Sequence, residues 1–404
     1  MDLRKNYVAI FFANIINYFG DVLFDLFIVW KITEKSGNVM NAVYLIGSSI
    51  LFRAILALFI GVLVDRKNKK KMIIFSNFSS SIIIFIFAVF YSFIIENIWI
   101  GLVFILINDI NNEIFSRSYI TISSELLSKE VFIKFQAKYT LVNRIITIAG
   151  SGIVGFLVTY LSEKVIFLID ILTFLICALA MSTIRYNFKK SDGTESNRHV
   201  KEVIKEIGFD IKYMFSVMFK TPFIVKFVII MFILNMAYGY IPHILPVEIA
   251  NGYSSAVLLG FIKSAMAIGE VIGLLIVTRF GQYVSRLFKI SMIGNTVCML
   301  LLTEIKQAYI TLVIFMLYGV LDSITQPLFS YTVTRLDKAD RGKILGGIDA
   351  IILMSPSIGM YVISRLMNFN IYVGYVSLAI IFGSVFLIVK FSRELSRITV
   401  KKED

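Results

Sequence analysis

Residues 61–71 read GVLVDRKNKKK, one acid followed by a dense cluster of cations. A long apolar stretch precedes this segment and another follows it. A turn this short and this basic between two membrane-length helices is expected to face the cytoplasm, because Lys and Arg are enriched in cytoplasmic loops. The segment therefore predicts a membrane protein and orients the two helices that it joins.

The composition of the chain also points to a membrane. Of its 404 residues, 58% are hydrophobic and 17% are charged, whereas about 25% are charged in an ordinary soluble domain. The apolar runs are continuous rather than alternating, which excludes a membrane β-barrel. A helical span takes roughly 20 residues, so a chain of this length accommodates about twelve spans. We predict an all-α membrane protein.

Polar turns between the apolar runs divide the chain into twelve predicted transmembrane helices, six on each side of one long connection. Residues 1–184 are predicted to form an N-terminal six-helix bundle, residues 185–222 a cytoplasmic linker, and residues 223–404 a C-terminal six-helix bundle. The predicted spans lie near residues 6–31, 41–64, 72–95, 98–121, 141–161, 165–184, 223–248, 255–278, 287–303, 308–333, 343–366 and 371–390.

The linker contains apolar residues at helical spacing over residues 203–215, with charges on the other face. This pattern is typical of a basic amphipathic helix that lies along the inner membrane surface. The alternative is a simple connecting segment, and the two descriptions are compatible.

The net charge of +13 is unevenly distributed along the chain. Most of the 40 Lys and Arg fall at the N-terminus, in alternate loops from Arg66 onward, and at the C-terminus. This asymmetry predicts that both termini are cytoplasmic, and it explains the basic character without a nucleic-acid partner. The cations predicted at the opposite ends of the spans are Lys31, Lys35, Lys164, Lys306 and Arg365.

Other kinds of chemistry have little support in the sequence. Cys177 and Cys298 lie in different apolar spans, so neither a disulfide framework nor a metal site is expected. No phosphate-binding loop, catalytic triad or metal-ligand spacing is present, and His199 and His243 are isolated. The first apolar run is long enough to span and no small-residue cleavage site follows it, which predicts an uncleaved first helix. We expect neither enzymatic activity nor a cofactor.

Several motifs spread over most of the chain resemble those of one transporter family. They are Thr33–Gly37, Gly61–Lys71, Ile169–Asp170, Phe280–Gly281, Arg341–Gly342 and Pro356–Gly359. Together they resemble the major facilitator superfamily, in particular its drug:proton antiporters and most closely the macrolide-efflux group. The resemblance implies two pseudo-symmetric six-helix bundles, a cavity lined by the first, fourth, seventh and tenth helices, and a proton gradient as the energy source. It further implies a monomer in a bacterial-type inner or plasma membrane.

Two positions depart from the family pattern. The family's loop usually has Gly where this chain has Asn68, a residue that also tolerates a positive φ angle, so the turn is expected to survive. The fifth span of antiporters usually carries Gly-Pro, whereas residues 150–155 read GSGIVG. The small-residue packing face is kept, but the missing proline weakens the case for antiport.

The predicted fourth span is the richest in polar residues. Asn108, Asp109, Asn112, Glu113, Ser116 and Arg117 follow helical spacing and are expected to form one polar stripe. Charged groups inside a span cost about 2.5–3.5 kcal/mol each on insertion scales, so the stripe is expected to face a water-filled cavity and to handle substrate or protons. The alternative is an internal ladder in which Arg117 neutralises Glu113 one turn away.

Acidic residues in two other spans are further candidates. Asp21 and Asp25 lie one turn apart in the first span, and two like charges that share a site favour protonation of one of them, as proton coupling requires. The alternative for Asp25 is simple solvation near the outer surface. Asp322 is a lone acid in the tenth span, with a basic residue on a neighbouring helix as the alternative partner. Asp170 in the sixth span is expected to be structural.

Four other charged residues lie inside the predicted spans. Lys263 and Glu270 lie seven residues apart in the eighth span, and a structural tie to another helix is favoured for both. Arg53 in the second span and Lys226 in the seventh could equally be structural or functional.

The 61–71 segment also suggests a conformational latch made of Gly61, Asp65 and Arg66. Asp65 could pair with Arg66 and meet the N-terminus of the eleventh helix when the two halves close on the cytoplasmic side. Such contacts would stabilise the outward-open state, and protonation or substrate binding elsewhere would shift this equilibrium. The alternative, that the cations only set the topology, leaves the acid unexplained.

The function favoured by these patterns is a secondary exporter of amphipathic small molecules, drug- or macrolide-like, that works by alternating access. Asp21, Asp109 and Glu113 would exchange protons. Alternatives on the same fold are export of siderophores or peptides, lipid flipping, and uptake by symport. The expected partners are a small amphipathic substrate, protons and the lipid bilayer. A membrane enzyme or a receptor is disfavoured, because neither a reactive constellation nor a soluble sensory domain is visible.

Overall fold

The computed structural model describes residues 2–184, 222–305, 307–328 and 351–392, together with the single residues 186, 205, 208, 209, 216, 331, 348 and 395. The chain divides into two compact units. The first comprises Met1–Arg198 and Val247–Ser264, and the second comprises His199–Pro246 and Ala265–Asp404. The predicted amphipathic helix at 203–215 lies almost wholly outside the described residues, and the proposed linker boundaries stay a prediction.

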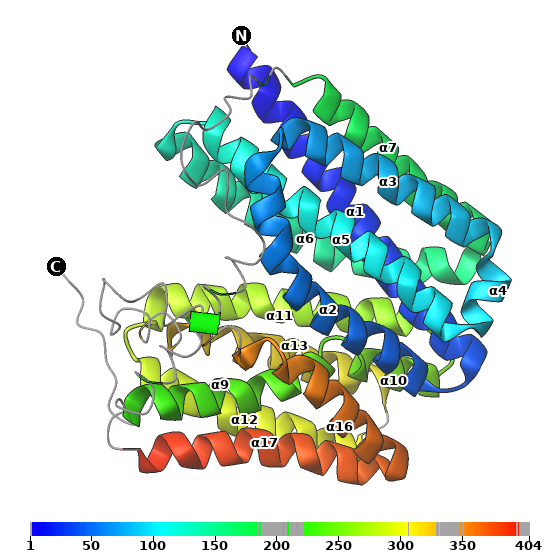
Figure 1. Ribbon diagram of the computed structural model, residues 1–404. Coiled ribbons are helices and arrows are strands. Elements are labelled where there is room, and N and C mark those ends of the chain that lie inside the picture. Colours follow the sequence, from blue (N-terminus) through cyan, green and yellow to red (C-terminus); the bar gives the residue numbers. More distant parts are fainter. Residues whose placement is uncertain are drawn as a thin grey trace. The chain divides into compact units, whose positions relative to one another are not determined.

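The described residues form helices joined by short turns (Figure 1). Up to the linker the helices are α1 (Asp2–Ser36), α2 (Val39–Arg66), α3 (Lys69–Val89), α4 (Tyr91–Glu96), α5 (Ile98–Leu126), α6 (Lys129–Tyr160) and α7 (Glu163–Ser182). After it come α9 (Pro222–Tyr240), α10 (Leu245–Gly252), α11 (Ala256–Phe280), α12 (Val284–Glu304), α13 (Ala308–Ser323), α16 (Ser355–Phe369) and α17 (Ile371–Phe391).

Ten segments of the described chain are long and apolar enough to cross a membrane, and Val39–Arg53 is a shorter apolar helix. The prediction of an all-α membrane protein is therefore confirmed. The start of the fifth span was predicted too late, because α6 begins at Lys129 rather than near residue 141. Charged residues such as Glu130, Lys134 and Lys138 lower the hydropathy of its first turns without interrupting the helix.

Two of the predicted spans contain a helix break. The seventh, predicted near 223–248, agrees with the apolar segment Phe223–Gly252, within which turns at residues 241–244 separate α9 from α10. Pro242 lies in this break. Proline lacks an N–H and disfavours helical geometry at the residue before it, which accounts for the interruption. The third span bends at Phe90, whose φ of −100° and ψ of 20° separate α3 from α4.

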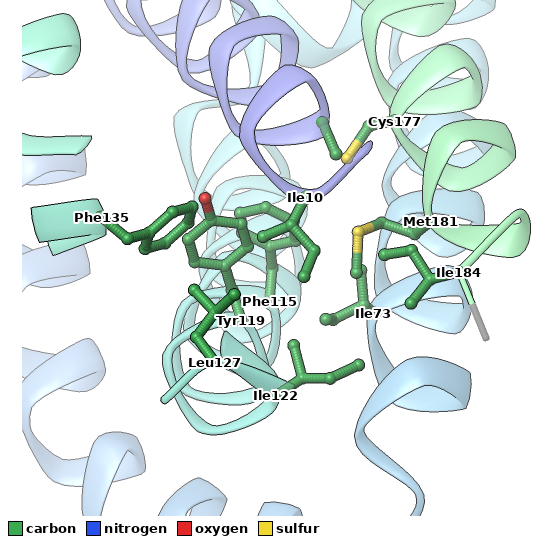
Figure 2. Close-up of a cluster of buried hydrophobic side chains, with 11 residues drawn as sticks. Ile10, Ile73, Phe115, Tyr119, Ile122, Leu127, Phe135, Cys177, Met181 and Ile184 are labelled. Carbon is green, nitrogen blue, oxygen red and sulfur yellow. The ribbon is translucent and has the colours of Figure 1, made fainter. Parts of the chain in front are cut away.

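Helix α1 is central to the first unit, in which it packs against α7, α6 and α2, while α3 packs between α7 and α5. A cluster of buried apolar side chains fills one end of this bundle (Figure 2). Tyr119 and Phe115 of α5 stack there, and Phe135 of α6 lies next to Tyr119. In a bilayer, whose lipid tails are as apolar as these side chains, such a cluster stabilises the bundle through van der Waals packing between the helices.

Close helix contacts in the second unit depend on glycines. A Cβ on Gly239 of α9 would collide with the backbone of Pro356, and one on Gly359 of α16 would collide with the backbone of Met236. The two glycines, one on each helix, thus allow α9 and α16 to pack closely at a single contact. This contact gives the Pro356–Gly359 motif a packing role.

The turn between α2 and α3 is shorter than expected. Helix α2 continues through Asp65 and Arg66, so only Lys67 and Asn68 connect the two helices. Asn68 has φ −65° rather than a positive φ, and its side-chain oxygen accepts a hydrogen bond from the Lys71 amide at 3.1 Å. Asparagine is thus used as an N-cap for α3, and a left-handed residue is not needed.

Candidate functional site

Polar side chains of α1 connect this helix to its neighbours. The Asn14 amide donates to Asn143 Oδ1 of α6 at 2.8 Å, and the Asn17 amide donates to Asn77 Oδ1 of α3 at 3.4 Å. Tyr18 Oη lies 3.1 Å from Thr147 Oγ1 of α6. Asn14 and Asn17 are almost fully buried, so their hydrogen bonds hold α1 against its neighbouring helices.

Two of the acids predicted from the sequence meet polar groups of neighbouring helices. Asp21 lies one turn further along α1, and Asp109 lies in α5. The Asn112 amide of α5 donates to Asp21 Oδ1 at 3.1 Å. The Ser49 hydroxyl of α2 donates to Asp109 Oδ2 of α5. Asp21 and Asp109 are half-buried. Each carboxylate therefore accepts one hydrogen bond from a neutral donor.

These acids form one electrostatic cluster, which we call the acid cluster and define as Asp21, Asp25 and Asp109. Asp21 lies within electrostatic reach of both other acids and of Arg53. Asp25 interacts with Arg53 and with Lys263, which belongs to the same unit. Asp25 and Arg53 are exposed, so the cluster has an accessible edge.

Members of the polar stripe predicted on the fourth span bond to different helices. Asn108 accepts a hydrogen bond from Ser80 of α3 at 2.8 Å, so it faces a different helix from Asp109 and Asn112. Glu113 accepts a bond from Arg117 Nε at 2.5 Å. That ion pair is the internal ladder considered as the alternative, and it neutralises Glu113 along its own helix.

Asp322 lies in the second unit. It is half-buried near the end of α13, within electrostatic reach of the Tyr238 and Tyr318 hydroxyls. Its backbone carbonyl accepts from Thr325 Oγ1 at 2.7 Å. The surroundings of this carboxyl thus include two phenols. Tyr318 lies one turn earlier on the same helix, whereas Tyr238 comes from α9 and could not be found from sequence spacing.

The proposed latch is only partly visible. Gly61, Asp65 and Arg66 lie in the last turns of α2, but their side chains fall outside what the structure describes, as does Arg341–Gly342. The neighbouring Lys70 is visible. Its Nζ donates to the carbonyl of Ser182, the last residue of α7, at 2.7 Å and to the carbonyl of Ile184, just beyond that helix, at 2.6 Å.

The cations at the C-terminal end of α1, which are exceptions to the charge asymmetry, have partners. Lys31 Nζ lies 2.8 Å from Glu34 Oε2 and 3.5 Å from Glu163 Oε1 of α7. Lys35 Nζ lies 4.5 Å from the centre of the Tyr91 ring. Nearby acids and an aromatic ring thus stabilise these cations at the end of the bundle where the positive-inside rule predicts few Lys and Arg.

A contact beyond the end of α7 joins this bundle to the chain that follows. The Tyr186 hydroxyl donates to Glu125 Oε2 of α5 at 2.5 Å. Burial and the adjacent Glu125 carboxylate both raise the pKa of Tyr186 above its ordinary value. The hydroxyl therefore stays protonated and remains a hydrogen-bond donor at physiological pH.

No group of three or more His, Cys, Asp or Glu that could hold a metal ion occurs in the part of the chain that the structure describes. Cys177 and Cys298 are both buried free thiols. The arrangement is thus one of carboxylates, amides and hydroxyls with Arg53 at its edge, which suits proton exchange and binding of a charged or polar solute.

The family model described as "Major Facilitator Superfamily" matches residues 10–337. This chain belongs to the major facilitator superfamily and is a multi-pass membrane transporter. No curated protein matches it by sequence.

Solved structures of the same fold include the nucleoside transporter NupG, at 14% identity over 97% of this chain and 100% of that chain, with a TM-score of 0.73. A D-xylose-proton symporter matches at 12% identity over 99% and 100% of the two chains, with a TM-score of 0.67. The human organic anion transporter MFSD10 matches at 11% identity over 96% and 99%, with a TM-score of 0.65. These similarities confirm the all-helical major facilitator fold.

Proposed function

We propose that this transporter exports amphipathic small molecules in exchange for protons, as a drug:proton antiporter with macrolide-like compounds among its substrates. The observation that carries the proposal is the acid cluster, in which three carboxylates lie within electrostatic reach of one another at a partly accessible site. Like charges held together in a poorly solvated site bind protons more readily than isolated ones. A cationic substrate and a proton would compete for the same negative charge.

Asp21 and Asp109 are the proposed proton-exchanging residues, because each is half-buried and bound by a neutral donor. Glu113 suits this role less well, since Arg117 already neutralises it. Arg53 would bias the cluster toward release of protons when substrate is absent. Asp322 and the latch of Gly61, Asp65 and Arg66 are proposed to act in the other bundle and at the cytoplasmic gate.

The test is drug efflux and proton movement in inverted membrane vesicles. Asp21→Asn and Asp109→Asn are expected to lose drug-driven proton movement, by at least tenfold, while binding of drug is retained. Glu304→Gln at the exposed end of α12 is the matched control and should transport normally. Transport that does not respond to a proton gradient, with both Asn variants fully active, would contradict the proposal.

The second candidate is uptake by proton symport. The D-xylose-proton symporter among the similar structures favours it as a use of the same fold. Counterflow assays with proteoliposomes, using sugars, nucleosides, lipids and drugs as separate substrates, distinguish uptake and lipid flipping from drug export. Accumulation of a polar solute driven by an inward proton gradient would favour symport.

The protein is proposed to lie in a bacterial-type inner or plasma membrane with both termini in the cytoplasm, as a monomer powered by the proton gradient without a bound cofactor. The charge asymmetry supports this orientation.

A further inference from the structure

Asp170 in α7 is the most deeply buried acid in the described chain, with 1% of its surface exposed. Neither of its carboxyl oxygens has a hydrogen-bond partner among the described residues. An ionised carboxylate in such a site loses its hydration without compensation, at a cost of several kcal/mol. A purely structural role does not explain why an acid occupies this position.

The carboxyl of Asp170 lies against the backbone of α1. A Cβ placed on Gly20 would be 3.0 Å from Asp170 Oδ1 and would collide with Thr173 Oγ1. Gly20 directly precedes Asp21, the central acid of the acid cluster. Asp170 of α7 therefore lies against α1 at Gly20, and Asp21 is the next residue of α1.

Thr173 limits the protonation states that this site accepts. Its single hydroxyl hydrogen is donated to the backbone carbonyl of Asp170 at 2.7 Å. Toward the nearby carboxyl the Thr173 oxygen is therefore left with acceptor capacity only. A protonated Asp170 could donate to it, whereas an ionised Asp170 would face another acceptor.

The charges around Asp170 act in the same direction. The ionisable groups of α1 within its electrostatic reach are Asp21 and Asp25, both acids. Helix α3, which also packs against α7, carries its lysines at its N-terminal end, where Lys70 is bound to the carbonyls beyond α7. Among the described residues, the charged groups that act on Asp170 are thus acids.

We propose that Asp170 is a second proton-binding site of the N-terminal bundle, linked to Asp21 through Gly20, and that the two carboxyls are not ionised together. Asp170 holds a proton in a dry position while Asp21 exchanges protons with the accessible site. The link to transport rests on the proposed role of Asp21, but proton binding by Asp170 can be measured without any transport.

The experiment is infrared difference spectroscopy of the full-length protein in nanodiscs, with isotope-labelled aspartate so that only aspartic acid carbonyl bands shift. The wild type is expected to show the C=O band of a protonated aspartic acid at neutral pH. Asp170→Asn and, as a second neutral replacement, Asp170→Ser should both lose this band. Monodisperse elution from size exclusion verifies that each variant is folded.

Linkage is tested with Asp21→Asn, which removes the neighbouring negative charge. The Asp170 band should then disappear at a lower pH than in the wild type, by about one pH unit or more, as expected for strongly interacting sites. Glu304→Gln at the exposed end of α12, which also removes one negative charge, is the matched control and should leave the midpoint of the Asp170 band unchanged.

Two results would overturn the proposal: no protonated aspartic acid band in the wild type at neutral pH, which needs no variant, or an Asp170 band that does not respond to Asp21→Asn. If instead the band behaves as expected while transport proves independent of protons, the proposed function fails and the proton site stands.

Discussion

At Gly20 the backbone of α1 lies so close to α7 that a methyl group has no room. Gly20→Ala is expected to lower the stability of the protein by about 1–3 kcal/mol, the usual cost of overpacking, even though alanine is the better helix former. The measurement is the thermal unfolding temperature in detergent.

Gly101→Ala in α5 is the matched control, because its added Cβ would lie 3.5 Å from Ile94 Cγ2, an ordinary contact distance. Its unfolding temperature should be unchanged or higher. A Gly20→Ala protein as stable as the wild type would mean that α1 and α7 are not held this closely.

The Glu113–Arg117 pair allows a second prediction at the scale of single residues. Both side chains are partly exposed, at 19% and 43%, and pairs four residues apart on one helix contribute about 0.3–0.5 kcal/mol. Glu113→Gln and Arg117→Gln should therefore change the unfolding temperature little and should leave proton-driven transport in place. Loss of proton coupling in Glu113→Gln alone would instead assign the proton-carrying role to Glu113.

Lys70 gives the basic turn after α2 a role in joining two helices. It binds two carbonyls at the C-terminal end of α7, where unpaired carbonyls and the negative end of the helix dipole attract a cation. We expect Lys70→Gln to lower stability by about 1 kcal/mol. Thermal unfolding of the purified protein measures this loss.

Lys71→Gln is the control, because Lys71 is exposed and its substitution removes the same charge from the same turn. If the cations acted only through membrane orientation, the two variants would be equally stable. Their difference therefore separates helix joining from orientation.

The helix boundaries show which features of the helices can be predicted from the sequence. The break between α9 and α10 could have been predicted, since Pro242 and Pro246 both fall inside the predicted seventh span. The early start of α6 was missed because hydropathy measures the apolar part of a helix, whereas backbone hydrogen bonding continues through charged turns. The N-cap role of Asn68 was missed because tolerance of positive φ was given more weight than capping.

Orientation is a property of the whole molecule. The charge asymmetry predicts that the N-terminus, the C-terminus and the turn at Lys67 all face the cytoplasm. Fluorescent-protein fusions at both termini should fluoresce, and a cysteine introduced at Asn97 should react with an impermeant thiol reagent added from outside. Labelling of Asn97→Cys only after the membrane is opened would reverse the proposed topology.

The composition, the spacing of apolar runs and the distribution of cations indicated on their own a helical membrane protein and predicted its orientation, and the Gly61–Lys71 motif added the resemblance to the major facilitator superfamily. These features suffice because a bilayer requires long apolar helices and orients them by charge. The acids Asp21, Asp25 and Asp109 could be nominated in the same way, since charge inside a span is costly wherever it lies.

Tertiary structure decided which neighbours these residues have. Helical spacing places Asn108, Asp109 and Asn112 on one helix, but only packing directs them to α3, α2 and α1 respectively. Packing also isolates Asp170 beside Gly20, although it looked structural in sequence. A side chain's partners come from other helices, and the contacts between helices depend on shape and on glycines that carry no chemical signal of their own.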